Sequence, residues 1–268
     1  KVLKEACDAY GVKDYTVLDH DGVKMAVFGL LGESAVEYAP ESGLIFKDAQ
    51  QTAKDVVNEI KDKEDVDLIV CISHCGTIEN ESDKLEESED YQLAENVPDI
   101  DLIVSGHSHT TLDEPVRVGD TYLVSCGSYN KNAGHAVLEK NENGEGYEMV
   151  SYELIPLDEN IDGDEAVEKE LDKYRKLVDE EYFSGYGYSA GQVIAENDVD
   201  FPAIDEFGLV QGEEPLGDLI ADSYKYAVSE ADGSDVDITI VPHGVIRGSF
   251  MKGEITVADA FNVSSLGY

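Results

Sequence analysis

The run Asp-Leu-Ile-Val occurs twice, at residues 67–70 and 101–104, and each copy leads into a short turn that contains histidine. The first copy continues as SHCGT (73–77) and the second as GHSHT (106–110). Short, continuous apolar runs of this kind are typical of strands buried on both faces of a parallel sheet. Residues 89–97, between the copies, predict a short helix, so the order of elements predicts a right-handed parallel βαβ unit.

Periodicity and turn residues predict the remaining elements. The first part of the chain is expected to contain a hairpin around residues 20–22, a helix over 46–63, strands over 66–73 and 100–106, and hairpins over 114–127 and 133–157. A bridging helix over 162–183 precedes a second α/β pattern, with strands at 191–196 and 236–241 and helices at 215–229 and 256–262. We therefore expect an α/β protein with domains at residues 1–160 and 190–268, joined by a linker at 161–189.

Composition restricts the classes of function. A chain of 268 residues with 42% hydrophobic residues is long and apolar enough for buried cores in more than one domain. No apolar run reaches the roughly 18 residues of a membrane span, so no transmembrane segment is expected. The 59 acidic residues against 19 basic ones give a net charge of −40, which argues against binding to a nucleic-acid polymer.

Three of the six histidines, His74, His107 and His109, lie in the two turns that follow the repeated strands. In an open parallel sheet, ligands bind beyond the carboxyl ends of the strands, so these imidazoles are expected to converge on one crevice. Imidazole suits zinc, manganese or iron, and we interpret the three histidines as metal ligands. The alternative, in which each histidine is held by unrelated hydrogen bonds, requires three coincidences at two strand ends.

The two turns together resemble those of the calcineurin-like metallophosphoesterases, specifically the bacterial 5′-nucleotidases, in which Ser-His-x-Gly and Gly-His-x-His-Thr turns contribute to the metal site. The resemblance extends to LGDLIADSY (216–224) and VPHGVIRGSFMKGEITVADAF (241–261), which are similar to the nucleotidase C-terminal domain. It implies a metallophosphatase-type layered sheet domain over 1–160, of which this chain holds the C-terminal part, and the first part of a 5′-nucleotidase C-terminal α/β domain over 190–268.

The resemblance also implies a chemistry. Two divalent metal ions, zinc, manganese or similar, are expected in the full-length protein, with His74 and His107 on one metal and His109 on the other. A metal-activated hydroxide would then hydrolyse a small phosphate ester, in this family a nucleotide. Members of this branch are mostly secreted, periplasmic or attached to the cell wall, so the same location is expected here.

Two departures from the family pattern qualify these expectations. The family's Asp-x-His and Gly-Asn-His blocks should precede the first hairpin and are not in this sequence, so the chain is expected to be the middle of a longer protein, to hold no catalytic residue and to be inactive alone. Where nucleotidases carry Asn-Gly-Gly-x-Ile-Arg, this chain has residues 242–247, PHGVIR. Arg247 is expected to bind the phosphate or substrate. The asparagine position is Pro242, so His243 either donates a hydrogen bond to the substrate in its place or is an incidental histidine.

Two alternatives stay open at this point. A non-catalytic surface or binding protein on the same scaffold is favoured by the altered PHGVIR segment, whereas His74, His107 and His109 favour an enzyme. A nucleotide-sugar or cyclic-nucleotide phosphodiesterase would keep the metal chemistry and change the substrate.

Overall fold

The computed structural model describes residues 2–33, 38–78, 84–141, 146–158, 160–202 and 212–265. The chain divides into two compact units, Lys1–Asp162 and Gly163–Tyr268. None of the helices in the described ranges has the length and hydrophobicity that a membrane span requires. The predicted α/β class is confirmed, because helices and strands alternate around a parallel-sheet core in the first unit.

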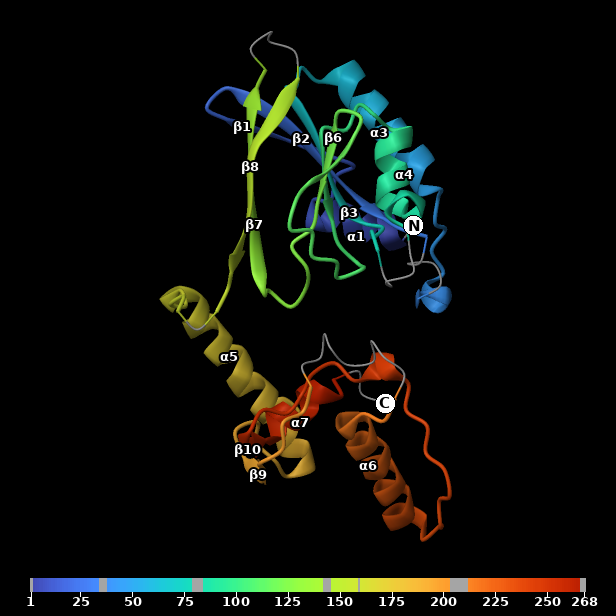
Figure 1. Cartoon of the computed structure of the whole chain (residues 1–268), viewed down its shortest axis with the longest axis vertical. Coiled ribbons are helices and arrows are strands. Elements are labelled where there is room, and N and C mark those ends of the chain that lie inside the picture. Colours follow the sequence, from blue (N-terminus) through green and yellow to red (C-terminus); the bar gives the residue numbers. More distant parts are fainter. Residues whose placement is uncertain are drawn as a thin grey trace. The chain divides into compact units, whose positions relative to one another are not determined.

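A six-stranded sheet with the order β1-β2-β3-β4-β6-β5 forms the centre of the first unit (Figure 1). Its strands are β1 (Thr16–His20), β2 (Val23–Leu31), β3 (Leu68–His74), β4 (Leu102–Ser105), β5 (Val116–Val118) and β6 (Thr121–Val124). Strands β2, β3, β4 and β6 run parallel to one another, and the edge strands β1 and β5 pair antiparallel with β2 and β6. The hairpins predicted at residues 20–22 and 114–127 are thereby confirmed.

Helices α3 (Ala49–Lys63) and α4 (Glu89–Asn96) pack on one face of this sheet (Figure 1). Helix α3 begins where the Asp48 carboxylate accepts a hydrogen bond from the Gln51 backbone N–H. The core beneath the two helices includes Val57, Ile60 and Leu93, none of which is more than 1% exposed. The predicted βαβ unit is confirmed, since β3 and β4 are parallel neighbours and α4 connects them.

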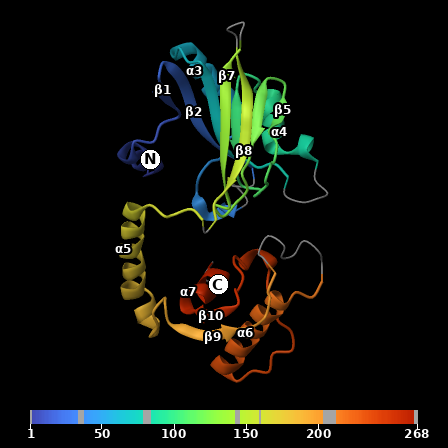
Figure 2. The same cartoon turned by 60° about the vertical axis from the view of Figure 1, so that its left-hand side comes forward.

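Strands β7 (Asn132–Lys140) and β8 (Tyr147–Pro156) form the last hairpin of the first unit, as predicted for residues 133–157. The hairpin lies on the side of the sheet opposite to α3 and α4 (Figures 1 and 2). Polar contacts join it to the sheet: the Tyr152 hydroxyl donates to the Ser125 carbonyl, and Arg117 donates to Glu148. Helix α1 (Val2–Tyr10) precedes β1 in the chain.

The second unit contains α5 (Glu165–Glu181), β9 (Val193–Asn197), α6 (Pro215–Asp232), β10 (Gly253–Thr256) and α7 (Val257–Val263) (Figure 2). Its small core is built from Leu216, Ile220, Ile246 and Val263. The strand predicted at residues 236–241 is wrong, because this segment has no regular secondary structure, and β9 pairs instead with β10. The sequence did not predict β10.

Candidate metal-binding site

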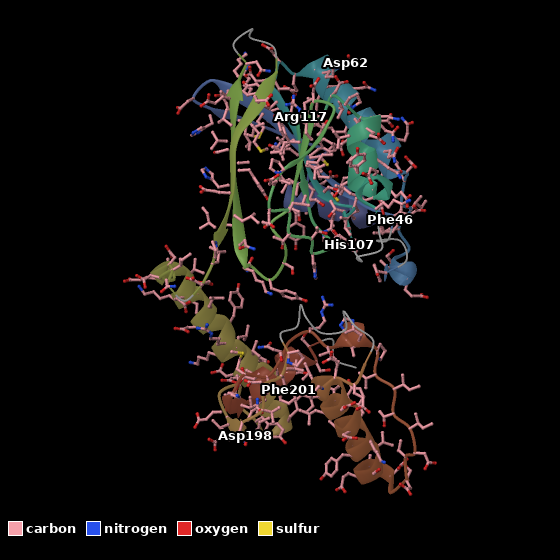
Figure 3. All side chains as sticks on the ribbon, viewed as in Figure 1. Phe46, Asp62, His107, Arg117, Asp198 and Phe201 are labelled. Atoms are coloured by element: carbon pink, nitrogen blue, oxygen red, sulfur yellow. The ribbon has the colours of Figure 1, made fainter. Side chains whose placement is uncertain are left out.

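His74 is the last residue of β3, and His107 lies two residues beyond the end of β4. Because these parallel strands are neighbours, with Ser73 opposite Ser105, both histidines leave the sheet at its carboxyl edge. Their ring centroids are 5.0 Å apart, with the planes inclined by 57°. Figure 3 labels His107 at this end of the first unit. The structure therefore brings two of the three predicted ligands together.

Two glycines leave room for these rings. A Cβ on Gly106 would lie 3.2 Å from Nδ1 of His74, and a Cβ on Gly76 would lie 3.4 Å from Cδ2 of His107. Gly76 also has a φ of +99°, a backbone conformation that L side chains rarely adopt. A side chain at Gly106 would crowd the His74 imidazole, and one at Gly76 would be strained by the backbone conformation, so glycine suits both positions.

The turn after β4 has an unusual backbone that hydrogen bonds stabilise. His107 and His109 have φ values of 77° and 58°, in the left-handed region that non-glycine residues seldom occupy. Between them, the Ser108 hydroxyl accepts from the Thr77 backbone N–H at 2.9 Å and lies 2.9 Å from the Thr110 hydroxyl. Because Thr77 follows β3, these bonds tie the two histidine turns to each other.

His109 has a different ring neighbour from the other two histidines. Its ring meets the ring of Tyr129 edge-on, with centroids 5.4 Å apart. Within the described residues, no group of three or more His, Cys, Asp or Glu side chains is arranged to hold a metal ion. The prediction that His74, His107 and His109 all act as metal ligands therefore stays a prediction.

Behind the two turns lies a buried carboxylate that the sequence reasoning missed. Asp90, in the first turn of α4, is 0% exposed and accepts hydrogen bonds from Ser73, Ser105 and Gly76. Burial raises the pKa of the Asp90 carboxyl above its usual value, and these hydrogen bonds act in the opposite direction. A signal did exist in the sequence: Asp90 occupies a position on the apolar stripe of α4 that also contains Leu93 and Ala94.

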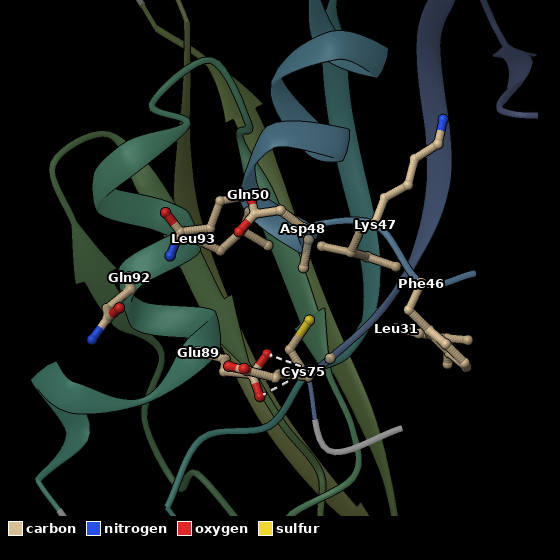
Figure 4. A pocket seen from close by; sticks show the side chains of 13 residues that line it. Leu31, Phe46, Lys47, Asp48, Gln50, Cys75, Glu89, Gln92 and Leu93 are labelled. Atoms are coloured by element: carbon tan, nitrogen blue, oxygen red, sulfur yellow. Dashed lines mark hydrogen bonds between the residues drawn. The ribbon is translucent and has the colours of Figure 1, made fainter. Parts of the chain in front are cut away.

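A pocket of about 310 Å³ lies beside the site, next to Cys75 and Glu89 (Figure 4). Both carboxylate oxygens of Glu89 accept from the Glu33 backbone N–H, as the dashed lines show. Burial raises the pKa of the Cys75 thiol to about 12, so the thiol is protonated at neutral pH.

The two residues predicted to bind substrate lie in the second unit. His243 begins a short 3₁₀ helix that ends at Val245, and its side chain is exposed. Arg247 is also exposed, and its Nη1 donates to the Gly244 carbonyl at 3.4 Å. The backbone of Arg247 is fixed by a hydrogen bond from its N–H to the Val263 carbonyl. The predicted roles of Arg247 and His243 in substrate binding stay predictions.

Comparisons with known proteins identify related sequences and folds. Residues 193–267 match the family model of the 5′-nucleotidase C-terminal domain. The chain is 30% identical over 262 residues to the trifunctional nucleotide phosphoesterase protein YfkN of Bacillus subtilis, covering 96% of this chain and 16% of that protein. It is 28% identical over 297 residues to a 5′-nucleotidase of Vibrio cholerae, covering 94% of this chain and 50% of that protein.

The fold has a close match among solved structures. A 5′-nucleotidase precursor from Thermus thermophilus matches 95% of this chain and 49% of its own length, with a TM-score of 0.66 and 24% sequence identity. The chain thus spans half or less of the length of each of these relatives.

Proposed function

The chain is a relative of the bacterial 5′-nucleotidases, and on that premise we propose that it forms part of a metal-dependent phosphoesterase that hydrolyses nucleotides or related phosphate esters. One structural observation supports this proposal most directly. His74 and His107 leave adjacent parallel strands at the same sheet edge, with ring centroids 5.0 Å apart. Ligand sites in open α/β sheets lie at this edge.

The residues at this edge fit a role in metal binding. Two imidazoles lie there with their ring centroids 5.0 Å apart, and a Cβ on Gly106 would crowd the His74 ring. Imidazole nitrogen is a common ligand for zinc and manganese. Bound divalent metal ions would supply Lewis-acid activation of the attacking water and of the phosphoryl group. We propose that His74 and His107 hold one ion and that His109 holds the second.

Arg247 and His243 are proposed to contact the substrate. A guanidinium can bind two phosphate oxygens through parallel N–H donors, and Arg247 is exposed. A local cation of this kind also offsets the repulsion that a chain with a net charge of −40 exerts on an anionic substrate.

We further propose that the protein acts outside the cytoplasm. Fractionation of the source cells tests this proposal, and detection of the protein in the cytoplasmic fraction alone would contradict it.

Phosphate release is the direct test of the proposed function. We expect the full-length protein to release inorganic phosphate from nucleoside monophosphates or related esters in the presence of Zn²⁺ or Mn²⁺. Chelation of the metal should abolish the release, and readdition of the metal should restore it. A protein that binds nucleotides but releases no phosphate with any divalent metal would contradict the enzyme and support the non-catalytic alternative.

Replacing Arg247 by Ala should weaken catalysis partially. The substitution removes a charge-assisted contact to the substrate and leaves the metal-binding histidines intact. Loss of a contact worth about 1.5–3 kcal/mol lowers kcat/KM by about ten- to a hundredfold, mainly through KM. Arg175→Ala is the matched control, because Arg175 is an exposed arginine of the same unit that donates to Asp172 and Glu168. Equal kcat/KM values for the two variants would show that Arg247 does not contact the substrate.

A further inference from the structure

The Asp90 carboxylate connects the carboxyl ends of two strands. Its Oδ1 accepts from the Ser73 hydroxyl at 2.5 Å, and its Oδ2 accepts from the Ser105 hydroxyl at 2.5 Å. Oδ2 also accepts from the Gly76 backbone N–H at 3.2 Å. One side chain of α4 therefore binds the last part of β3, the last residue of β4, and the turn that follows β3.

The positions of these donors relate Asp90 to the histidines. Ser73 immediately precedes His74, and Ser105 precedes His107 by two residues. Ser73 and Ser105 are also register partners across β3 and β4. A displacement of either serine would therefore move the start of one histidine turn relative to the other histidine turn. The Ser73 hydroxyl also accepts from the Cys75 backbone N–H at 3.1 Å, which extends the same network to the residue after His74.

An apolar side chain could fill the space of Asp90 but could not bond its neighbours. Asp90 is 0% exposed and shares its helix face with Leu93 and Ala94, so an apolar side chain would suit the core. Burial of a carboxylate costs free energy that its hydrogen bonds must offset, and an apolar replacement would leave the Ser73, Ser105 and Gly76 donors without this acceptor. What an apolar side chain does not provide is acceptors for both serines and for Gly76.

We propose that Asp90 is a positioning residue of the candidate metal site: by holding Ser73 and Ser105 at one point, it sets the separation of the His74 and His107 imidazoles. This inference rests on the proposed function, because it assumes that these two imidazoles bind a metal ion. Fixing ligands before the metal arrives removes the cost of ordering them on binding, and hydrogen-bonded groups behind the ligands commonly change metal affinity. Asp90 itself need not contact the metal.

The test is a titration of the full-length protein with Co²⁺, followed by visible absorption, which reports both the affinity and the geometry of the ligands. Asp90→Ala should weaken Co²⁺ binding by about ten- to a hundredfold and change the spectrum. Asp90→Asn should recover most of the affinity. Its amide carbonyl can still accept from Ser105 and Gly76, and its NH₂ group can donate to the Ser73 hydroxyl oxygen.

Thr121→Val is the matched control for lost stability. Thr121 is also 0% exposed, and its hydroxyl donates to the Ile100 carbonyl at 2.7 Å, at the start of β6. This variant should lower Tm while keeping the affinity for Co²⁺ and the spectrum of the wild-type protein. If Asp90→Ala does not fold, Ser105→Ala takes its place, with a smaller loss of affinity expected because only one of the three hydrogen bonds is removed.

The outcomes separate the inference from the function on which it rests. A wild-type protein that binds no Co²⁺ would reject the proposed metal site, and the role of Asp90 with it. If the wild-type protein binds Co²⁺ and Asp90→Ala, or Ser105→Ala in its place, keeps the wild-type affinity and spectrum, the positioning role alone is rejected. An Asp90→Asn variant as weak as Asp90→Ala would also reject it, because the charge of Asp90 and not its hydrogen bonds would then matter.

Discussion

His107→Ala should abolish phosphate-ester hydrolysis by the full-length protein, with kcat/KM at about one-thousandth or less of the wild-type value. The His107 ring lies 5.0 Å from the His74 ring, so the substitution leaves His74 without its neighbouring imidazole. A metal ion held by fewer ligands is bound more weakly or displaced, and the activation of the attacking water is lost with it. Metal content, measured beside the kinetics, should fall together with the rate.

Two further variants test whether loss of the His107 imidazole is the cause of the lost activity. His107 has a φ of 77°, where alanine is strained and glycine is not, so His107→Gly should be as inactive as His107→Ala without the strain. His135→Ala is the control, because His135 is an exposed histidine of β7 whose Nδ1 lies 2.9 Å from Glu153. The His135→Ala variant should keep full activity. The metallophosphoesterase assignment fails if His107→Ala or His107→Gly retains both metal and rate.

Gly32→Ala should be strongly destabilising. A Cβ at Gly32 would lie 2.6 Å from the Cys75 Cα and 2.9 Å from Oε2 of Glu89, and the first of these atoms belongs to the backbone. The end of β2 and the turn after His74 would have to separate, although the Gly32 N–H donates to the His74 carbonyl at 3.2 Å. Overpacking of this kind costs about 1–3 kcal/mol and occasionally more, which denaturant unfolding should detect.

Gly29→Ala is the matched control for this substitution. Gly29 lies on β2, three residues before Gly32, and a Cβ added there would have the Ile72 carbonyl oxygen as its nearest neighbour at 3.9 Å, an ordinary contact. Because glycine in a strand costs about 0.5–1 kcal/mol relative to alanine, Gly29→Ala should be neutral or slightly stabilising. Equal stabilities for the two variants would contradict the close approach of Gly32 to Cys75.

The sequence predicts the first unit well because its signals are local and mutually consistent. The turn at Asp21 and Gly22 marks the β1–β2 hairpin, and Gly119 and Asp120 mark the β5–β6 hairpin. The continuous apolar runs of β3 and β4 form parallel neighbours, as such runs predict, but they are not buried on both faces, because Ile72 and Val104 are 56% and 38% exposed. The short helix between them then leaves few topologies to consider.

The failure at residues 236–241 has a different physical origin. The segment is rich in β-branched residues, yet Ile238 and Ile240 are 79% and 84% exposed. A strand needs a partner as well as local propensity, and β9 takes its partner from residues 253–256. Pairing between segments so far apart in the chain leaves no signal in either segment alone. The same limit explains why β10 was not predicted.

The candidate site was likewise predictable from the sequence only in part. His74 and His107 were predicted to meet because each follows a recognisable buried strand, and their rings are neighbours. The edge-on contact of His109 with Tyr129 depends on the conformation of a loop, which residue types alone do not determine. Asp90 is one of 59 acidic residues, and its importance comes from partners that lie 15 and 17 positions away in the sequence.

The placement of Asp90 also bears on how such a site can diversify. The bonds from Asp90 reach the ends of β3 and β4 from a helix in the core, so they hold the two histidine turns from behind, in addition to the bond between Thr77 and Ser108 that joins the turns directly. Loop positions that take no part in these bonds are then free to change while the two turns stay joined. Selection for a new substrate can act on the loops while the distance between His74 and His107 is inherited unchanged.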